Sequence, residues 1–334
     1  MAKSGLGAVL AVAVLGVSAL AGCSARVGGE PVAATTISEP PEPTAENVLG
    51  DLSTIDPCSL TDPEAFESFG TTELATPESL DYCAISIEPS ADVQVIISVG
   101  LLGELSDTPE LESKKSDELD NGLYTARRDD SPGFCSQALV FVDEITLDVG
   151  SSTYQGDSPD TCPMVEAGMA KVLEVIDENG VKHREPEPDS LVSVDPCALV
   201  DDETVTALPG FAAAKRREYP AHHQCYWETS SDESRLSVRL VFGAGPQPTT
   251  WAPTGANSDP IAGRPSVTNP FPEAGTSAFC SVDSGHIPFE EVDVTEDIVE
   301  LASVFVRTPT GQVDAGCQAA VAVATKVWPR LPTP

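Results

Sequence analysis

The sequence predicts an α+β fold with two homologous domains, each an antiparallel sheet packed by a short N-terminal helix and a longer C-terminal helix. Three observations support this prediction. Two sets of four cysteines recur in matching contexts, apolar and polar residues alternate between these cysteines, and each set ends in a segment with apolar residues at helical spacing. Two disulfides are expected to staple each domain.

The first 22 residues have the pattern of an export signal. Lys3 precedes an apolar run from Leu6 to Leu20 that is too short to span a bilayer comfortably. The residues Leu20-Ala21-Gly22 before Cys23 resemble the bacterial lipobox, in which the cysteine receives a diacylglycerol. We therefore expect residues 1–22 to be a signal peptide, and Cys23 to anchor an exported protein to the outer face of the cell membrane. The alternative is an ordinary secretory signal followed by a coincidental cysteine.

Residues 23–50 are the expected tether, because Pro, Gly, Ala, Glu and Thr dominate this segment. Fully extended at about 3.1 Å per residue, the tether would hold the first domain up to roughly 80 Å from the bilayer. No other apolar stretch approaches the roughly 18 residues of a transmembrane helix. The lipid on Cys23 is therefore the only membrane attachment that we expect.

The remaining eight cysteines predict disulfides, since they form an even number in a chain whose thiols would oxidise after export. Each set of four allows three pairings. We favour the sequential pairing, in which each loop of about 25 residues would contribute on the order of 3 kcal/mol, while the other pairings stay open. The favoured pairs are Cys58 with Cys83, Cys135 with Cys162, Cys197 with Cys225, and Cys280 with Cys317.

The contexts of these cysteines indicate a duplicated domain. Ile55–Leu60 matches Val194–Leu199 in its Asp-Pro-Cys-x-Leu core, and Phe134-Cys135-Ser136 matches Phe279-Cys280-Ser281. Four matched contexts in the same order are improbable by chance. The predicted boundaries are a first domain over residues 51–177, a linker over 178–190 and a second domain over 191–334.

Secondary structure is expected to follow the same plan twice. Short helices over Asp62–Phe69 and Asp201–Leu208 would end near glycines, and the charged stretch Thr108–Asp120 would form a short helix. Strands are expected at Tyr82–Glu88, Val93–Leu101, Ala138–Val142, Ile145–Val149, Cys225–Thr229, Arg235–Phe242 and Glu300–Val306. The closing helices would bury Val165, Met169, Val172 and Ile176 in the first half, and Cys317, Val321, Ala324 and Trp328 in the second.

The motifs also resemble a known family. The Asp195–Leu199 opening, with Cys225-Tyr226-Trp227 downstream, is similar to actinobacterial cell-envelope lipoproteins that share a domain of unknown function. The first half departs from the pattern, because Cys83-Ala84-Ile85 lacks the aromatic residue two positions after the cysteine. The resemblance implies no catalytic residue and no cofactor.

The net charge of −35 excludes nucleic acid as a partner, because such a field repels phosphate backbones. Residues 51–180 contain no histidine, so an active site that both domains share cannot depend on one. His222, His223 and Glu228 suggest a less favoured metal site or hydrolase in the second domain, and His286 is expected in a surface insertion. The acidic run Asp117–Gly122 lacks the ligand spacing of a calcium loop.

Two further features bear on binding. Trp251 lies in the Pro-rich segment Gly245–Pro272, where an exposed aromatic would serve as a binding anchor, although packing on its own sheet is equally compatible. Lys215-Arg216-Arg217 is the second domain's basic cluster and is expected to be a solvated surface.

We therefore predict a non-enzymatic, lipid-anchored envelope protein that acts as a binding or accessory module for a surface protein or an envelope component. The main alternative is a carrier of a lipid or small molecule, with a pocket between each sheet and its terminal helix. A hydrolase or metal site in the second domain is less favoured. No metal or other cofactor is expected.

Overall fold

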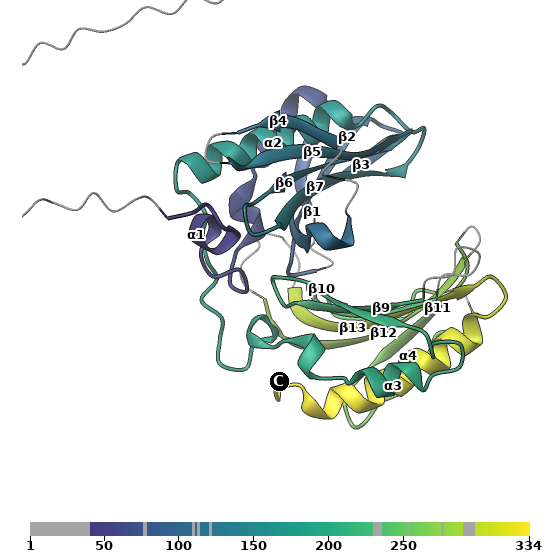
Figure 1. Ribbon diagram of the computed structural model, residues 1–334. Coiled ribbons are helices and arrows are strands. Elements are labelled where there is room, and N and C mark those ends of the chain that lie inside the picture. The colour runs from purple at the N-terminus through teal and green to yellow at the C-terminus, as the bar shows by residue number, and fades with distance from the viewer. Residues whose placement is uncertain are drawn as a thin grey trace, which may run out of the picture. The chain divides into compact units, whose positions relative to one another are not determined.

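The computed structural model describes residues 41–75, 79–108, 111, 114–119, 122–229, 236–252, 254–274, 277–289 and 298–334 (Figure 1). Residues 41–334 form one compact unit. The predicted signal peptide and Cys23 lie outside the described residues. Within the described residues, no helix is both long and apolar enough to span a bilayer.

The first sheet has seven antiparallel strands in the order β1-β2-β3-β7-β6-β5-β4. Alternating residues of its central strands enter the core, because Val95, Ile97 and Val99 are buried on one face. The strands are β1 (Thr71–Ala75), β2 (Cys83–Ser90), β3 (Val93–Glu104), β4 (Lys115–Glu118), β5 (Tyr124–Ser131), β6 (Phe134–Val140) and β7 (Ile145–Gln155).

The second sheet has six antiparallel strands in the order β11-β12-β13-β10-β9-β8. Trp227, Val238 and Leu240 are fully buried on its core side. The strands are β8 (Lys215–Glu218), β9 (Gln224–Glu228), β10 (Ser237–Pro246), β11 (Val267–Ala274), β12 (Ser277–Pro288) and β13 (Ile298–Pro309).

The two sheets share one topology. Read from β1 and from β8, the orders β1-β2-β3-β7-β6-β5 and β8-β9-β10-β13-β12-β11 correspond strand by strand, and β4 is an addition to the first sheet. The equivalent cysteines Cys83 and Cys225 pair with Val99 and Leu240 on the next strand, so the registers correspond as well. The predicted α+β architecture with two similar sheets is confirmed.

Helices cover one face of each sheet, which we call the helix face; the opposite side is the open face. Helix α2 (Cys162–Asp177) packs on the first sheet through Val165, Met169 and Val172, and α4 (Val313–Val327) packs on the second. Figure 1 shows α3 (Asp202–Thr206) beside α4 below the second sheet. The expected first short helix is a 3-10 helix, Pro63–Phe69. Other short 3-10 turns are Pro57–Leu60, Leu105–Asp107, Leu191–Ser193, Pro196–Ala198 and Trp328–Arg330.

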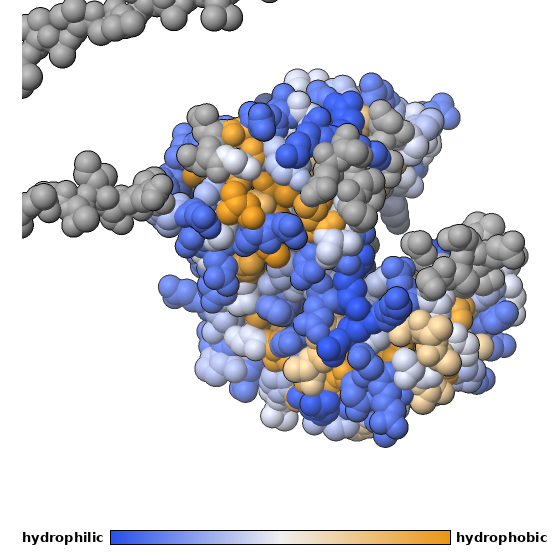
Figure 2. All heavy atoms as spheres, in the orientation of Figure 1, coloured by the Kyte–Doolittle hydropathy of each residue, from blue (hydrophilic) through white to orange (hydrophobic). Residues whose placement is uncertain are grey.

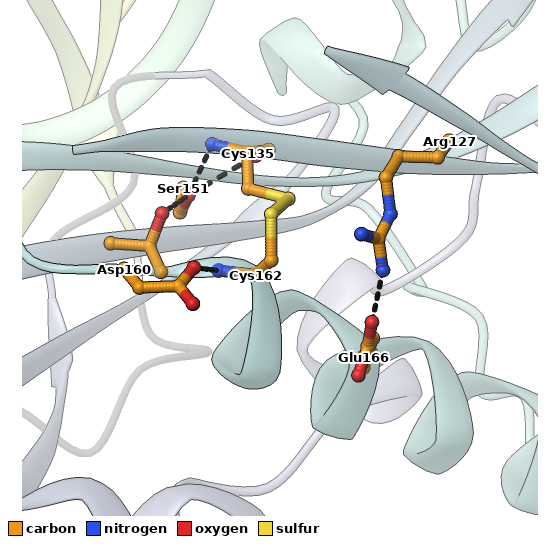
Figure 3. The surroundings of a disulfide bond; sticks show 7 residues. Arg127, Cys135, Ser151, Asp160, Cys162 and Glu166 are labelled. Atoms are coloured by element: carbon orange, nitrogen blue, oxygen red, sulfur yellow. Dashed lines mark hydrogen bonds and ion pairs between the residues drawn. A yellow bond between two sulfur atoms is a disulfide. The ribbon is translucent and has the colours of Figure 1, made fainter. Parts of the chain in front are cut away.

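The four disulfides join sequential cysteines, which is the pairing that the sequence favoured. In each half, one bond ties the Asp-Pro-Cys turn to β2 or β9, and the other ties β6 or β12 to the terminal helix. Figure 3 shows Cys135 and Cys162 with Ser151 beside them; the Ser151 hydroxyl lies 2.9 Å from the Cys135 amide and 3.1 Å from its carbonyl oxygen. The disulfides therefore hold each sheet to the helices on its helix face.

Several expectations were wrong. Within the described part of Thr108–Asp120, where a short helix was expected, Lys115–Glu118 form strand β4, because Ser116 bonds Thr125 and Lys115 lies over the Tyr124 ring of β5. The Pro-rich segment ends in the edge strand β11, where proline is tolerated. His286 is buried in β12 rather than in a surface insertion, with Nε2 2.7 Å from the Asp189 carbonyl oxygen.

The predicted tether and linker also differ from the structure at their ends. Residues 45–49, placed in the tether, form helix α1 (Ala45–Leu49), whose Ala45 and Leu49 are buried in the first core. The linker makes backbone contacts with the first half. Its His183 bridges Ile55, and the Arg184 amide donates a hydrogen bond to the carbonyl of Thr54. Residues 41–50 of the predicted tether and the predicted linker are therefore parts of the folded unit.

Candidate functional site

The open faces of the two sheets line one cleft of about 640 Å³. The first sheet contributes small and apolar residues such as Ala84, Ile96 and Ser98, and the second contributes Arg217 and Arg239. Four of the chain's five tyrosines line the same cleft: Tyr82, Tyr154, Tyr219 and Tyr226. A volume of this size lies within the range of about 300–1,000 Å³ that is typical of ligand pockets.

A row of alternating arginines and aromatic rings crosses the open face of the second sheet. Arg217 on β8 pairs in register with Tyr226 on β9, Tyr226 pairs with Arg239 on β10, and Arg239 pairs with Phe305 on β13. Register partners lie on the same face of a sheet, roughly 5 Å apart. We call Arg217, Tyr226, Arg239 and Phe305 the arginine–aromatic row.

Arg217 is the most constrained member of the row. Its guanidinium carbon lies 4.8 Å from the centre of the Tyr219 ring and 5.1 Å from that of Tyr226, within cation–π range. Its Nε lies 3.6 Å from Oδ2 of Asp107, which belongs to the first half. Burial opposes the charge, but Tyr219 and Asp107 favour it, so the pKa of Arg217 is raised overall. Burial raises the pKa of Tyr219, because it disfavours the charged phenolate.

Arg239 and Arg307 have neutral partners instead. Arg239 Nε donates to Gln224 Oε1 at 3.0 Å, and Arg307 Nε donates to Ser277 Oγ at 2.8 Å while its guanidinium lies over the Phe279 ring. Within the described part of the chain, no carboxylate forms an ion pair with either guanidinium. Both arginines border a second hollow of about 250 Å³, together with Tyr226, Ser237, Phe279 and Phe305.

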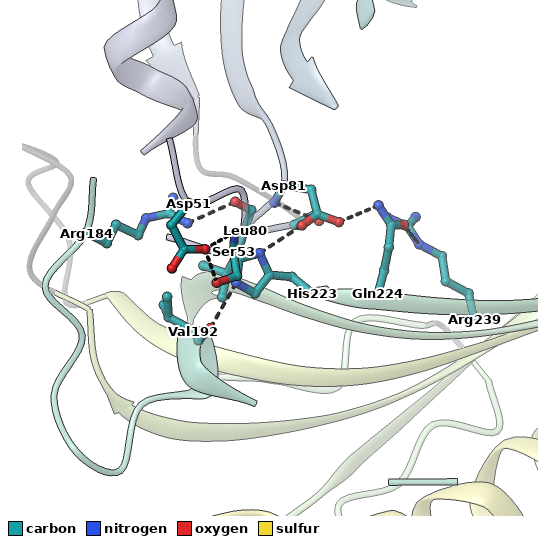
Figure 4. Close-up of polar contacts among 10 residues, drawn as sticks. Asp51, Ser53, Leu80, Asp81, Arg184, Val192, His223, Gln224 and Arg239 are labelled. Atoms are coloured by element: carbon teal, nitrogen blue, oxygen red, sulfur yellow. Dashed lines mark hydrogen bonds and ion pairs between the residues drawn. The ribbon is translucent and has the colours of Figure 1, made fainter. Parts of the chain in front are cut away.

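A chain of buried polar contacts leads from Arg239 through Gln224 to Asp81 and His223 (Figure 4). Gln224 Nε2 donates to Asp81 Oδ2 at 2.6 Å, and Asp81 Oδ1 lies 2.8 Å from His223 Nδ1. His223 Nε2 lies 3.0 Å from the Val192 carbonyl oxygen, which can only accept, so Nε2 carries a proton. The side chains of Asp81 and His223 are almost fully buried. These contacts connect the first half, through Asp81, to the guanidinium at the centre of the row.

The first sheet has small residues at the equivalent positions. Ala75, Ala84, Ser98 and Gly150 are register partners in the same order across β1, β2, β3 and β7. We call them the small-residue row. Three of these four residues, all except Gly150, line the cleft opposite the arginine–aromatic row. The small side chains of this row leave space within the cleft, although Tyr82, Ile96 and Tyr154 of the first half also line it.

Trp251, the binding residue predicted from the sequence, lies at the far end of the second sheet. Its ring centre is 3.9 Å from that of Phe271, and Asn269 Oδ1 accepts a hydrogen bond from its backbone amide. Trp251 is packed on its own sheet and yet remains 50% exposed, with Phe271 38% exposed.

The face in view in Figure 2 is mostly hydrophilic, with hydrophobic residues collected in a few patches.

The less favoured metal or hydrolase site at His222, His223 and Glu228 does not come together among the described residues. His222 is exposed, His223 is bonded to Asp81 and Val192, and Glu228 lies beside the Tyr226 hydroxyl. The described residues include no group of three or more His, Cys, Asp or Glu side chains arranged to hold a metal ion. The basic cluster Lys215–Arg217 lies on strand β8, where Lys215 and Arg216 are exposed, as expected of a solvated surface, and Arg217 is half-buried. Part of the acidic run Asp117–Gly122 lies outside the described residues.

Sequence reasoning missed the arginine–aromatic row because its members are far apart in the chain. The signal that would have found it is the comparison of the repeats around the second cysteine, where Ala84 stands against Tyr226. When the comparison is extended to the paired strands, Ser98 is equivalent to Arg239 and Ser152 is equivalent to Arg307.

Comparisons with known proteins add a family and a weak structural likeness. The model of a family described as "Protein of unknown function (DUF3558)" matches residues 177–330. A comparison with curated proteins found no match. A solved structure with some similarity is the di-domain ARO/CYC StfQ from the steffimycin biosynthetic pathway, at 7% identity over 83% of this chain and 96% of that chain, with a TM-score of 0.21. A score this low carries no argument. The family model matches residues 177–330, which is less than half of the chain.

Proposed function

We propose that this protein is a non-enzymatic binding module of the cell envelope, and that its ligand occupies the cleft between the two open faces. The arginine–aromatic row carries this proposal. It gathers half-buried cations and ring faces on a concave surface, which is the usual composition of a recognition site. The four disulfides support an oxidising compartment outside the cytoplasm.

The cleft lies on the open faces, whereas the carrier alternative expected a pocket between each sheet and its terminal helix. Core side chains fill that space, since Met169 and Val172 of α2 and Ala320 and Val323 of α4 are buried against the sheets. The carrier hypothesis therefore applies to the opposite faces.

A blocking substitution tests the cleft. Ser98 lies on the first wall of the cleft, so Ser98→Trp should fill part of it, whereas Ser68→Trp adds the same ring at an exposed site on a 3-10 helix. Each variant would be purified from its native envelope, and bound molecules identified by mass spectrometry. We expect a molecule that is recovered with the unchanged protein and with Ser68→Trp to be lost from Ser98→Trp. Equal recovery from all three would contradict the proposal.

We further propose that the module is an actinobacterial lipoprotein held at the outer face of the cell membrane by a lipid on Cys23. The apolar run ahead of Leu20-Ala21-Gly22-Cys23 supports this anchor. Cys23→Ser should move the protein from the membrane fraction to the medium and remove the mass of the acyl chains. Retention of Cys23→Ser in the membrane would contradict lipid anchoring.

A second candidate function is docking of another envelope protein on Trp251 and Phe271. Adjacent half-exposed aromatic rings support it, since such rings are enriched among binding anchors. Trp251→Ala should then weaken capture of a protein partner in crosslinking experiments without changing recovery of the cleft ligand. Unchanged capture would exclude this surface.

A further inference from the structure

We propose that the cleft and the adjoining hollow together take a small amphipathic anion, with an aromatic or aliphatic body and one or two carboxylate or phosphate groups. This inference rests on the proposed function and names its ligand class. Arg239 and Arg307 would bind the charged group, and the rings of Tyr226, Phe279 and Phe305 would contact the apolar body.

Among the described residues, no carboxylate forms an ion pair with Arg239 or Arg307, whose side-chain partners are neutral. Both guanidinium groups are partly buried and bonded to neutral oxygens, those of Gln224 and Ser277. Partial burial of a cation without an opposite charge is unfavourable, and planar guanidinium groups match carboxylate and phosphate in bidentate geometry. The same chain pairs the exposed Arg216 with Asp202 and Glu218. The two open-face arginines therefore have binding capacity that an anionic ligand would use.

The charge of the chain and the volume of the site both favour a compact anion. A net charge of −35 repels long polyanions, which extend beyond a local cationic site. The cleft and the adjoining hollow share Tyr226 and Arg239, and their volumes of about 640 and 250 Å³ suit a compact molecule. A ligand with one or two charges on an apolar body meets both conditions.

The guanidinium of Arg239 is held in a fixed position by hydrogen bonds. Gln224 accepts from Arg239 Nε and donates to Asp81, whose other oxygen lies against His223. These bonds hold the guanidinium in place before a ligand arrives, which lowers the entropic cost of binding. Gln224 is thus a positioning residue for the anion site.

Two matched fluorescent probes test the proposal with the folded, disulfide-intact protein. 8-Anilinonaphthalene-1-sulfonate carries an anion on an aromatic body, and N-phenyl-1-naphthylamine is the same body without the sulfonate. Arg239→Gln and Arg307→Gln remove the proposed anion contacts. Arg216→Gln is the control, because Arg216 lies on the helix side of β8 with carboxylate partners. Melting temperatures would verify that every variant is folded.

We expect the sulfonate probe to bind saturably and to lose about tenfold in affinity in each open-face variant, with little change in Arg216→Gln. The neutral probe should bind all four proteins alike. Equal effects on both probes, or no binding of the sulfonate, would overturn the anion assignment. The proposed function would survive that result if Ser98→Trp still loses the native ligand, so the two failures are distinguishable.

Displacement of the sulfonate probe then separates two sources of the same chemistry. Dodecyl phosphate represents an acidic lipid, and phenyl phosphate represents a soluble aromatic acid. The proposal is supported if either competitor displaces the probe from the unchanged protein at a lower concentration than from Arg239→Gln. The competitor that does so identifies the source of the anion. Failure of both to displace the probe would overturn it.

Discussion

The two open faces differ much more than the two helix faces. On the helix side, both sheets pack a terminal helix through a disulfide and a continuous apolar core. On the open side, Ala84, Ser98 and Gly150 of the first sheet stand where the second has Tyr226, Arg239 and Phe305. The shared side maintains the fold, which leaves the other side free to diverge. In one copy these positions hold small residues, and in the other they hold arginines and aromatic rings.

The largest expected effect tests what the halves share. Replacing Cys280 and Cys317 by serine removes a bond across 37 residues, and replacing Cys135 and Cys162 removes one across 27. Each double variant should lose roughly 3.5 to 4 kcal/mol of unfolding free energy, because the unfolded chain regains its entropy. Chemical denaturation measures both losses. A large loss in one half with none in the other would break the equivalence of the two helix faces.

A somewhat smaller effect is expected where the halves meet. His223→Ala leaves the Asp81 carboxylate buried without its imidazole partner, which should cost about 3 kcal/mol in unfolding free energy. The control is His222→Asn, an exposed neighbour with a positive φ of 58° that asparagine tolerates. If the two variants were equally stable, the buried contact would contribute nothing to the joined structure.

The repeat-equivalent phenylalanines sharpen the comparison of the open faces. Phe279 lies under Arg307, whereas Phe134 is 42% exposed and pairs with Ser152. Phe279→Ala should weaken binding of the sulfonate probe about fivefold, since it removes both a ring contact and the support of a cation. Phe134→Ala should leave the affinity unchanged. Equal losses would mean that both faces take part in binding.

The smallest effect concerns Asp283, which occupies the position of Ala138 in the first sheet. Burial raises the pKa of the Asp283 carboxyl, although bonds from Ser303 and Ser281 lower it. Because the folded pKa lies above the unfolded one, ionisation costs stability as the pH rises through the folded value. Asp283→Asn should therefore raise the melting temperature by roughly 2 °C at pH 7 and have no effect near pH 3.

The control for this titration is Asp259→Asn, an exposed carboxyl of the same half, which should not change the melting temperature at either pH. A gain in Asp283→Asn that persisted at acid pH would show that burial of the charge is not its cause.

Much of the fold was predictable because cysteine spacing and helical periodicity are local patterns. The repeat, the disulfides and the amphipathic terminal helices follow from residues near one another in the chain. The strand β4 was not predictable, since its exposed residues form a strand only through pairing with β5. His286 was misplaced for a similar reason, because its partner is the carbonyl of Asp189, 97 residues away.

The cleft was beyond sequence reasoning because it depends on register. Tyr226 and Arg239 are adjacent only through the pairing of β9 with β10, and a shift of one residue would turn both toward the core. The opposite wall depends on a separate sheet. Trp251 was visible from the sequence as an isolated aromatic, but its contact with Phe271 needed the path of β11.

The contact between Asp81 and His223 has a consequence for how such a molecule can be assembled. Asp81 lies two positions before Cys83, and His223 lies two positions before Cys225. The contact therefore joins equivalent positions of the two repeats. In a symmetric dimer of a single repeat, this point of self-contact would bring together two acids or two imidazoles. When both repeats are parts of one chain, the two equivalent positions can carry different residues. An acid in one repeat can then contact a base in the other.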